Sequence, residues 1–105
     1  MILNKYGESL KIDDRVFTVG GRVFANESSE YSGLYGKIVE IRTGADKETD
    51  NEGIDIYVSF EEPEDELIAE LEARFSELYR EPKTINEIAL DLVIMSPEML
   101  DIIEE

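Results

Sequence analysis

Tyr31-Ser32-Gly33-Leu34-Tyr35-Gly36-Lys37-Ile38-Val39-Glu40-Ile41 is the segment from which the rest of the predicted architecture follows. Gly33 and Gly36 stand three residues apart, directly before a short apolar run. Glycine accepts positive φ angles and the close approach of a second backbone. The pair therefore predicts a tight turn that leads into a strand of a small barrel.

The strand after these glycines, at about 34–43, contains a break in its alternation. Ile38 and Ile41 are three residues apart, so they cannot share a face of a regular strand. Either Val39 and Ile41 face the core, or a bulge near Val39 and Glu40 lets both isoleucines point inward. We favour the bulge, because a small barrel has to bend its strands.

Upstream, Gly20 and Gly21 separate two short runs that are rich in β-forming residues. A two-residue hairpin turn needs positive φ angles, which glycine supplies. We therefore predict strands at about 15–19 and 22–26 that pair antiparallel through this turn.

Downstream, residues 54–60 give the clearest strand pattern in the chain, because apolar side chains alternate strictly with others. The side chains on one face are Ile54, Ile56, Val58 and Phe60, and those on the other are Asp55, Tyr57, Ser59 and Glu61.

One amphipathic helix is predicted at about 64–80. Pro63 suits a first helical turn, and the acidic residues after it complement the positive end of the helix dipole. Glu70 precedes Arg74 by four residues, which favours an ion pair. Pro82 prevents continuation, and we expect the apolar stripe of the helix to pack on the open side of the barrel. The stripe consists of Leu67, Ile68, Leu71, Phe75, Leu78 and Tyr79.

The end of the chain is predicted to hold one more strand and a short helix. Residues 87–95 have apolar side chains on both faces, which is typical of a strand between two layers. A helix over 85–92 remains the alternative. Ser96 and Pro97 suit a helix N-cap and first position, so a short C-terminal helix over 97–103 is predicted.

Together these elements predict a single α+β domain over residues 1–105, with a small antiparallel barrel, one amphipathic helix and a short C-terminal helix. Residues 31–41 also resemble the KOW motif, whose pattern is aromatic-x-Gly-x-x-Gly-x-aliphatic-x-x-aliphatic, and residues 56–60 resemble the strand that follows it. The resemblance covers residues 31–60 and implies a Src-homology-3-like barrel. It also implies contacts with RNA or with partner proteins.

Cysteine and histidine are both absent. Their absence excludes disulfides, thiolate and imidazole metal sites, cysteine nucleophiles and histidine bases. The acidic loop that begins at Asp46 lacks the glycine and glutamate that a calcium loop needs at its sixth and twelfth positions, where Asn51 and Tyr57 stand. With neither a signal segment nor a membrane-length apolar run, we expect a cytoplasmic protein. Because histidine and cysteine are absent and no convergent polar groups indicate a cleft, we expect that it is not an enzyme and that it holds no cofactor or metal.

The net charge of −16 is distributed unevenly. Residues 1–26 carry four cations and three anions, whereas residues 27–105 carry six cations against 23 anions. Such a surface attracts basic partners and repels phosphates and anionic lipids, so we expect no direct binding of nucleic acids or membranes. The simpler explanation, that the acidic chain only favours solubility, remains open.

The leading hypothesis is that the acidic helix face and the acidic loop imitate a row of phosphates. The protein would then occupy a basic surface of a nucleic-acid-handling partner, as a nucleic-acid mimic or inhibitor. Small acidic inhibitors carried by phages and mobile elements are similar in size and charge. The predicted contacts are Glu48, Asp50, Glu52, Glu66, Glu70 and Glu77.

The second hypothesis is an adaptor that binds a peptide or subunit through Tyr31, Tyr35 and the turn between the two glycines. We expect Tyr31, in a polar loop, to be exposed, whereas Tyr35 either joins it or covers the barrel surface. A third hypothesis is an RNA-contacting module that uses Lys37 and Arg42, but the acidic surroundings disfavour it.

Overall fold

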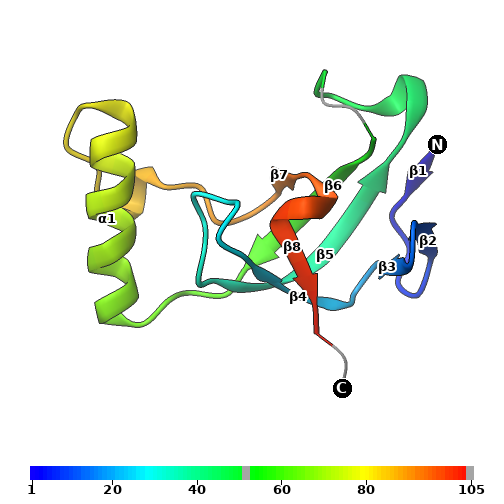
Figure 1. Ribbon diagram of the computed structural model, residues 1–105, viewed down its shortest axis with the longest axis horizontal. Helices are drawn as coiled ribbons and strands as arrows, with labels where there is room; N and C mark the ends of the chain where they lie inside the picture. Colours follow the sequence, from blue (N-terminus) through cyan, green and yellow to red (C-terminus); the bar gives the residue numbers. More distant parts are fainter. Residues whose placement is uncertain (51–52, 104–105) are drawn as a thin grey trace.

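The computed structural model describes residues 1–50 and 53–103 of the chain. Within these residues the α-helix lies at one end of the molecule and the strands fill the centre and the opposite end (Figure 1). The strands are β1 (Ile2–Leu3), β2 (Ser9–Ile12), β3 (Arg15–Thr18), β4 (Arg22–Ala25), β5 (Tyr35–Arg42), β6 (Asp55–Phe60), β7 (Val93–Met95) and β8 (Leu100–Ile102). The helix is α1 (Asp65–Tyr79), and 3-10 turns cover Gly44–Asp46, Ile85–Glu87 and Pro97–Met99.

The strands form one large sheet and one separate hairpin. The large sheet has the order β7-β6-β5-β4-β8, with β1 also paired to β5, whereas β2 and β3 pair only with each other. Every pairing is antiparallel, so the predicted α+β class with antiparallel strands is confirmed. The sheets are not closed into a barrel within the described residues, and the Src-homology-3-like barrel stays a prediction.

The bulge in β5 is confirmed. The register between β5 and β6 shifts between Ile38 and Glu40, which leaves Val39 as the additional residue. Ile38 and Ile41 are both buried, while Val39 is partly exposed. The extra residue resets the alternation, so two isoleucines at an odd spacing reach the same core.

Gly33, just before β5, and Gly36, the second residue of β5, serve the two purposes expected of glycine. Gly33 has a φ angle of +103°, in the region that favours glycine. A Cβ atom on Gly36 would lie only 2.7 Å from the carbonyl oxygen of Ser59 and 2.8 Å from the Val58 side chain. Gly33 therefore forms the turn, and Gly36 lets β6 pack against β5.

The predicted hairpin at Gly20 and Gly21 is wrong. β3 pairs with β2 across a turn in which Asp13 has a φ angle of 55°, and β4 pairs with β5 and β8. The N–H of Gly20 donates to the carbonyl of Ile38 at 2.7 Å, and the N–H of Ile38 donates to Gly21 at 3.0 Å. Both glycines thus lie alongside β5 and bond to its backbone. The chain passes here from β3 in the hairpin to β4 in the large sheet, so β3 and β4 do not pair with each other.

The β6 strand is buried on both faces. Ile56, Val58 and Phe60 enter the main core as the alternation predicts. On the opposite face Asp55 is completely buried and Tyr57 is 6% exposed. The loop before β6 folds back over this face.

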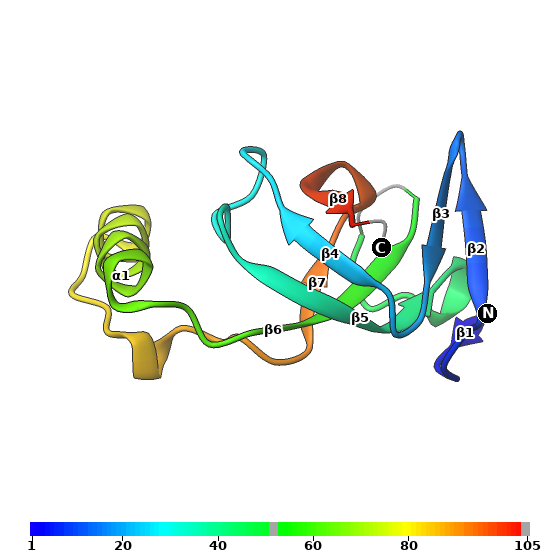
Figure 2. The same ribbon diagram turned by 90° about the horizontal axis from the view of Figure 1, so that it is seen from below.

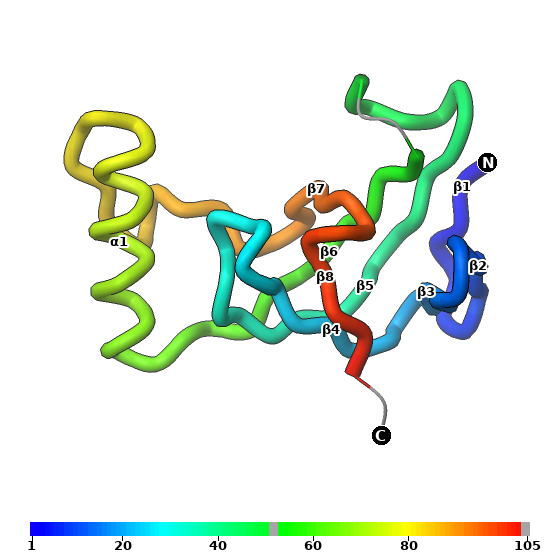
Figure 3. The backbone as a smooth tube through the Cα atoms, viewed as in Figure 1, coloured from blue at the N-terminus to red at the C-terminus, as the bar shows by residue number. Residues whose placement is uncertain are grey.

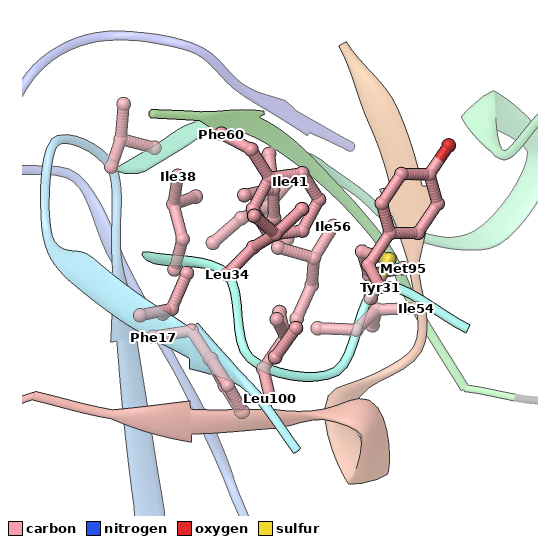
Figure 4. Packing of buried hydrophobic residues seen from close by; sticks show 14 of the residues in the cluster. Phe17, Tyr31, Leu34, Ile38, Ile41, Ile54, Ile56, Phe60, Met95 and Leu100 are labelled. Carbon is pink, nitrogen blue, oxygen red and sulfur yellow. The ribbon is translucent and has the colours of Figure 1, made fainter. Parts of the chain in front are cut away.

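The core lies between the large sheet, the β2–β3 hairpin and the segment 31–34 that precedes β5. Figure 4 shows Leu34, Ile41, Ile56 and Leu100 close together, although they come from four segments of the chain. Phe17 brings β3 into the same cluster, while Leu71 and Phe75 extend it to α1. The helix is therefore continuous with the core but touches it through few side chains.

The helix itself is confirmed at Asp65–Tyr79, and Arg80 ends it in the left-handed conformation. It lies beside one end of the sheet (Figure 2), and packing on the open side of a barrel stays a prediction, as the barrel does. Only the middle of the stripe is buried, and Leu78 and Tyr79 are 58% and 57% exposed. The predicted partner of Arg74, Glu70, is wrong: the Arg74 guanidinium donates to two backbone carbonyls of the 30–32 turn.

The end of the chain differs from both alternatives. The final strand is shortened to β7, and Leu92 before it has a φ angle of 53°, which a continuous strand or helix excludes. The helical alternative survives only as the turn Ile85–Glu87. The short C-terminal helix is replaced by the turn Pro97–Met99 and β8, which pairs with the free edge of β4 (Figure 3).

Candidate functional site

A groove of about 490 Å³ lies where the start of α1, the connection from β6 and the turn before β5 meet. Its apolar surface comes from Gly33, Leu34, Tyr35, Pro63 and Leu67. Its acidic surface comes from Glu61, Glu62, Glu64, Glu66 and Glu70. Figure 1 shows the three segments at the lower end of α1, where the green connection passes the cyan turn.

Two local features of the sequence bring these segments together. A Cβ atom on Gly33 would lie 3.2 Å from the Leu67 side chain, so the glycine allows the first turns of α1 to approach. The N–H of Glu61 donates to the carbonyl of Tyr35 at 2.8 Å, which fixes the connection to the start of β5. The groove is thus held by backbone geometry at the same turn that the two glycines predict.

One carboxylate of the groove is already paired with a cation. Glu61 accepts a hydrogen bond from Nη2 of Arg22 at 3.5 Å, and the Arg22 guanidinium lies 5.6 Å from the centre of the Tyr35 ring. The other four acidic side chains make no ion pair or side-chain hydrogen bond with any residue that the structure describes. The groove therefore presents four uncompensated carboxylates beside an aromatic ring.

The two predicted binding tyrosines are in different environments. Tyr35 is 46% exposed and packs one side of its ring against Phe24, with 4.9 Å between centroids. Tyr31 is only 7% exposed, because its ring stacks on Phe60 at 5.1 Å and meets Phe75 edge-on at 5.2 Å. The predicted exposure of Tyr31 is wrong, and the cause is α1, which supplies Phe75.

Burial also changes the acidity of Tyr31. Desolvation, with smaller contributions from the neighbouring Glu30 and Tyr79, raises the pKa of Tyr31 to about 12. In Figure 4 its ring lies at the edge of the labelled core residues, with the hydroxyl directed away from them. Tyr31 is therefore a core residue, and it does not line the groove.

The predicted acidic contacts fall into separate places. Glu66 and Glu70 line the groove, whereas Glu77 is exposed further along α1. Glu48 and Asp50 are exposed in the loop before β6, which lies at the opposite end of the molecule from α1 (Figure 1). The predicted contact Glu52 lies outside the described residues.

The loop before β6 has its own structural role. The backbone N–H groups of Glu48 and Thr49 donate to Oδ2 of Asp55 at 2.9 and 3.0 Å, and the Thr49 hydroxyl donates to Oδ1. The Arg42 guanidinium bonds to Glu48 at 3.0 Å and lies 4.9 Å from the Tyr57 ring centre. These contacts hold the loop against β6, so the loop covers this face of the strand.

Tyr57 lies beneath this cover. Its hydroxyl is buried and has no hydrogen-bond partner among the residues that the structure describes. Burial, followed by the nearby Glu48 carboxylate, raises the pKa of Tyr57 to about 12. The phenol is therefore neutral at physiological pH.

Sequence reasoning missed the part of the groove that Glu61, Glu62 and Glu64 supply. The available signal is the run 61–66, which holds five acidic residues in six positions. The acidic residues at the end of that run are already explained by the positive end of the helix dipole. Their part in a groove depends in addition on where the helix lies in the fold, which a local pattern does not indicate.

Comparison of the chain with protein-family models, with curated proteins and with solved structures finds no match. In the described residues no three acidic side chains are arranged to hold a metal ion. None of the described helices combines the length and apolar character needed to cross a bilayer.

Proposed function

We propose that the protein is a non-enzymatic, cytoplasmic acidic binding protein that occupies a basic surface of a nucleic-acid-handling partner. The observation that supports this most directly is the acidic groove with its four uncompensated carboxylates. We also propose that the strands belong to a small Src-homology-3-like barrel, to which α1 is an addition that supplies one wall of the groove.

The spacing of the carboxylates suits such a role. Glu66 and Glu70 are four residues apart on α1, which is about 6 Å along the axis. Phosphates on one strand of duplex DNA recur about every 3.4 Å along its axis. A basic channel built for phosphates therefore meets closely spaced negative charges at this end of the protein, although their axial density is lower than that of one DNA strand.

The test is affinity capture from source cells at two salt concentrations, followed by competition. We expect the captured partner to bind DNA or RNA, and we expect the acidic protein to displace that nucleic acid. Release of counterions makes log K fall linearly with log salt, so capture should be much weaker at 0.2 M than at 0.05 M salt. Capture that does not depend on salt, or a partner whose nucleic-acid binding continues undisturbed, would contradict the proposal.

The second candidate is an adaptor that uses the tyrosine turn, and the exposure of Tyr35 in the groove favours it. An adaptor of this kind predicts that Tyr35→Ala abolishes capture, while Glu66→Gln and Glu70→Gln have little effect. Tyr31→Ala does not separate the two functions, because removal of a buried aromatic ring costs about 3–5 kcal/mol of stability.

A further inference from the structure

We infer that the acidic groove receives an arginine side chain from an extended segment of the partner protein. This inference rests on the proposed function and names the occupant of its site. The guanidinium would lie beside the carboxylates of Glu66 and Glu70, and the aliphatic part of the side chain would cover Leu67 and the edge of Tyr35.

The first argument is charge complementarity within a formed groove. Glu62, Glu64, Glu66 and Glu70 surround a space of about 490 Å³ that also has an apolar surface. A small metal ion would use only the oxygens, whereas a long cationic side chain uses both kinds of surface. An anionic polymer is excluded from such a groove by repulsion.

The second argument is that the protein already holds a guanidinium at the end of this groove. Arg22 lies over Tyr35 and bonds to Glu61, which is the combination of aromatic ring and carboxylate proposed for the partner's arginine. At 3.5 Å this bond is long, and both side chains are partly exposed, so Arg22 is held weakly. An incoming arginine can compete for this position or fill the space next to it.

The third argument selects arginine over lysine. A planar guanidinium can bond to a carboxylate with two parallel hydrogen bonds and stack on an aromatic ring at the same time. An ammonium group is a more strongly hydrated point charge. A groove with several carboxylates and one tyrosine therefore favours arginine.

The experiment uses three fluorescently labelled nine-residue peptides of glycine and serine that carry three arginines, three lysines or three citrullines. Fluorescence anisotropy with the full chain at low salt gives their affinities. We expect the arginine peptide to bind several-fold more tightly than the lysine peptide, and the uncharged citrulline peptide not to bind. Equal affinity of the two cationic peptides would overturn the selection of arginine.

Matched variants test the location. Glu66→Gln with Glu70→Gln should weaken binding of the arginine peptide about tenfold. Glu77→Gln with Asp91→Asn removes the same charge from exposed positions outside the groove and should change affinity less than twofold. If both double variants weaken binding equally, the groove is not the site, although charge-driven binding, and hence the proposed function, would stand.

Arg22→Gln tests the competition. It removes the internal cation and should strengthen binding of the arginine peptide, whereas Lys11→Gln, with the same change in net charge, should do so less. Absence of peptide binding by every variant, together with retained capture of the natural partner, would overturn the inference and leave the proposed function in place. Thermal unfolding of each variant confirms that the fold is intact.

Discussion

Asp55 is a carboxylate in the most deeply buried strand of the protein. Burial alone would raise its pKa, but the hydrogen bonds from Thr49 and from the backbone of Glu48 outweigh this effect, and the pKa lies below its usual value. The folded protein thus stabilises the ionised form of the Asp55 carboxyl group. Because its donors are in the preceding loop, this single side chain determines that the loop covers β6.

At this scale we predict the effect of Asp55→Asn on stability and on its pH dependence. An amide cannot replace all the acceptor oxygens, so the variant should lose about 1–3 kcal/mol in the free energy of unfolding at pH 7. A lowered folded-state pKa gives a stabilisation that is present above about pH 4 and is lost as the pH falls through the folded-state pKa. The variant should therefore lose less stability than the wild type between pH 5 and pH 2.

Urea unfolding at several pH values measures both effects. The control is Asp91→Asn, at an exposed position, which should behave like the wild type. An Asp55→Asn variant with the stability and acid dependence of the wild type would show that the loop does not depend on this carboxylate.

The helix α1 is attached to the rest of the fold by hydrogen bonds to two other segments as well as by the buried side chains of Leu71 and Phe75. The Arg74 guanidinium donates to the carbonyls of Glu30 at 2.7 Å and Ser32 at 3.1 Å. On the returning chain, the N–H of Ile85 donates to Glu72 at 2.8 Å. These bonds supplement the small apolar contact of the helix, so they are expected to determine its local stability.

At this scale we predict that Arg74→Ala loosens α1 selectively. Loss of two hydrogen bonds from a charged donor should cost about 1–3 kcal/mol. Amide hydrogen exchange should accelerate in α1 and in the 30–34 turn, while β5 and β6 keep their protection. Glu77→Ala, on the exposed face of the same helix, is the control. Uniform acceleration over the whole chain, or none in α1, would refute this view of the attachment.

The elements that could be predicted from sequence are those whose signal is local. The periodicity of α1, the alternation in β6 and the odd isoleucine spacing in β5 each lie within one segment. Strand pairing is different, because Gly20 and Gly21 indicate a turn, in which Gly20 takes a positive φ angle, without specifying the partner strand. The three-residue β8 is too short for any pattern and exists because β4 offers an unpaired edge.

The same distinction applies to the candidate site. The sequence predicts Tyr35 as a contact under the adaptor hypothesis, and Glu66 and Glu70 as contacts under the hypothesis of a nucleic-acid mimic. Their meeting in one groove depends on the docking of α1 against the turn at Gly33, for which the sequence has no local signal. The same docking buries Tyr31, although its sequence neighbours are polar.

The whole molecule carries far more acidic than basic side chains, so most of its negative charge is not neutralised by ion pairs. Only five ion pairs form among the described residues, in a chain with 26 acidic residues and a net charge of −16. Most carboxylates therefore repel one another across the surface. This repulsion opposes folding, because the folded state holds the charges closer together.

At this scale we predict that sodium chloride stabilises the protein. The screening length falls from about 30 Å at 0.01 M salt to about 10 Å at 0.1 M, so the free energy of unfolding should rise over this range. A variant with Glu64, Glu66 and Glu70 changed to glutamine should gain less from the same salt, and urea unfolding measures the difference. Destabilisation by salt would mean that attractive pairs outweigh the repulsion.

The position of α1 at one end of the 37 Å long axis has a consequence for diffusion. Residues 61–81 contain nine acidic and two basic side chains. At the opposite end, residues 1–18 contain three of each, and the loop 43–50 contains three acidic and one basic side chain. The centre of charge is therefore displaced from the centre of mass, and the protein has a permanent electric dipole. Near a cationic surface the field exerts a torque that turns the helical end forward, so productive collisions are selected before any contact forms.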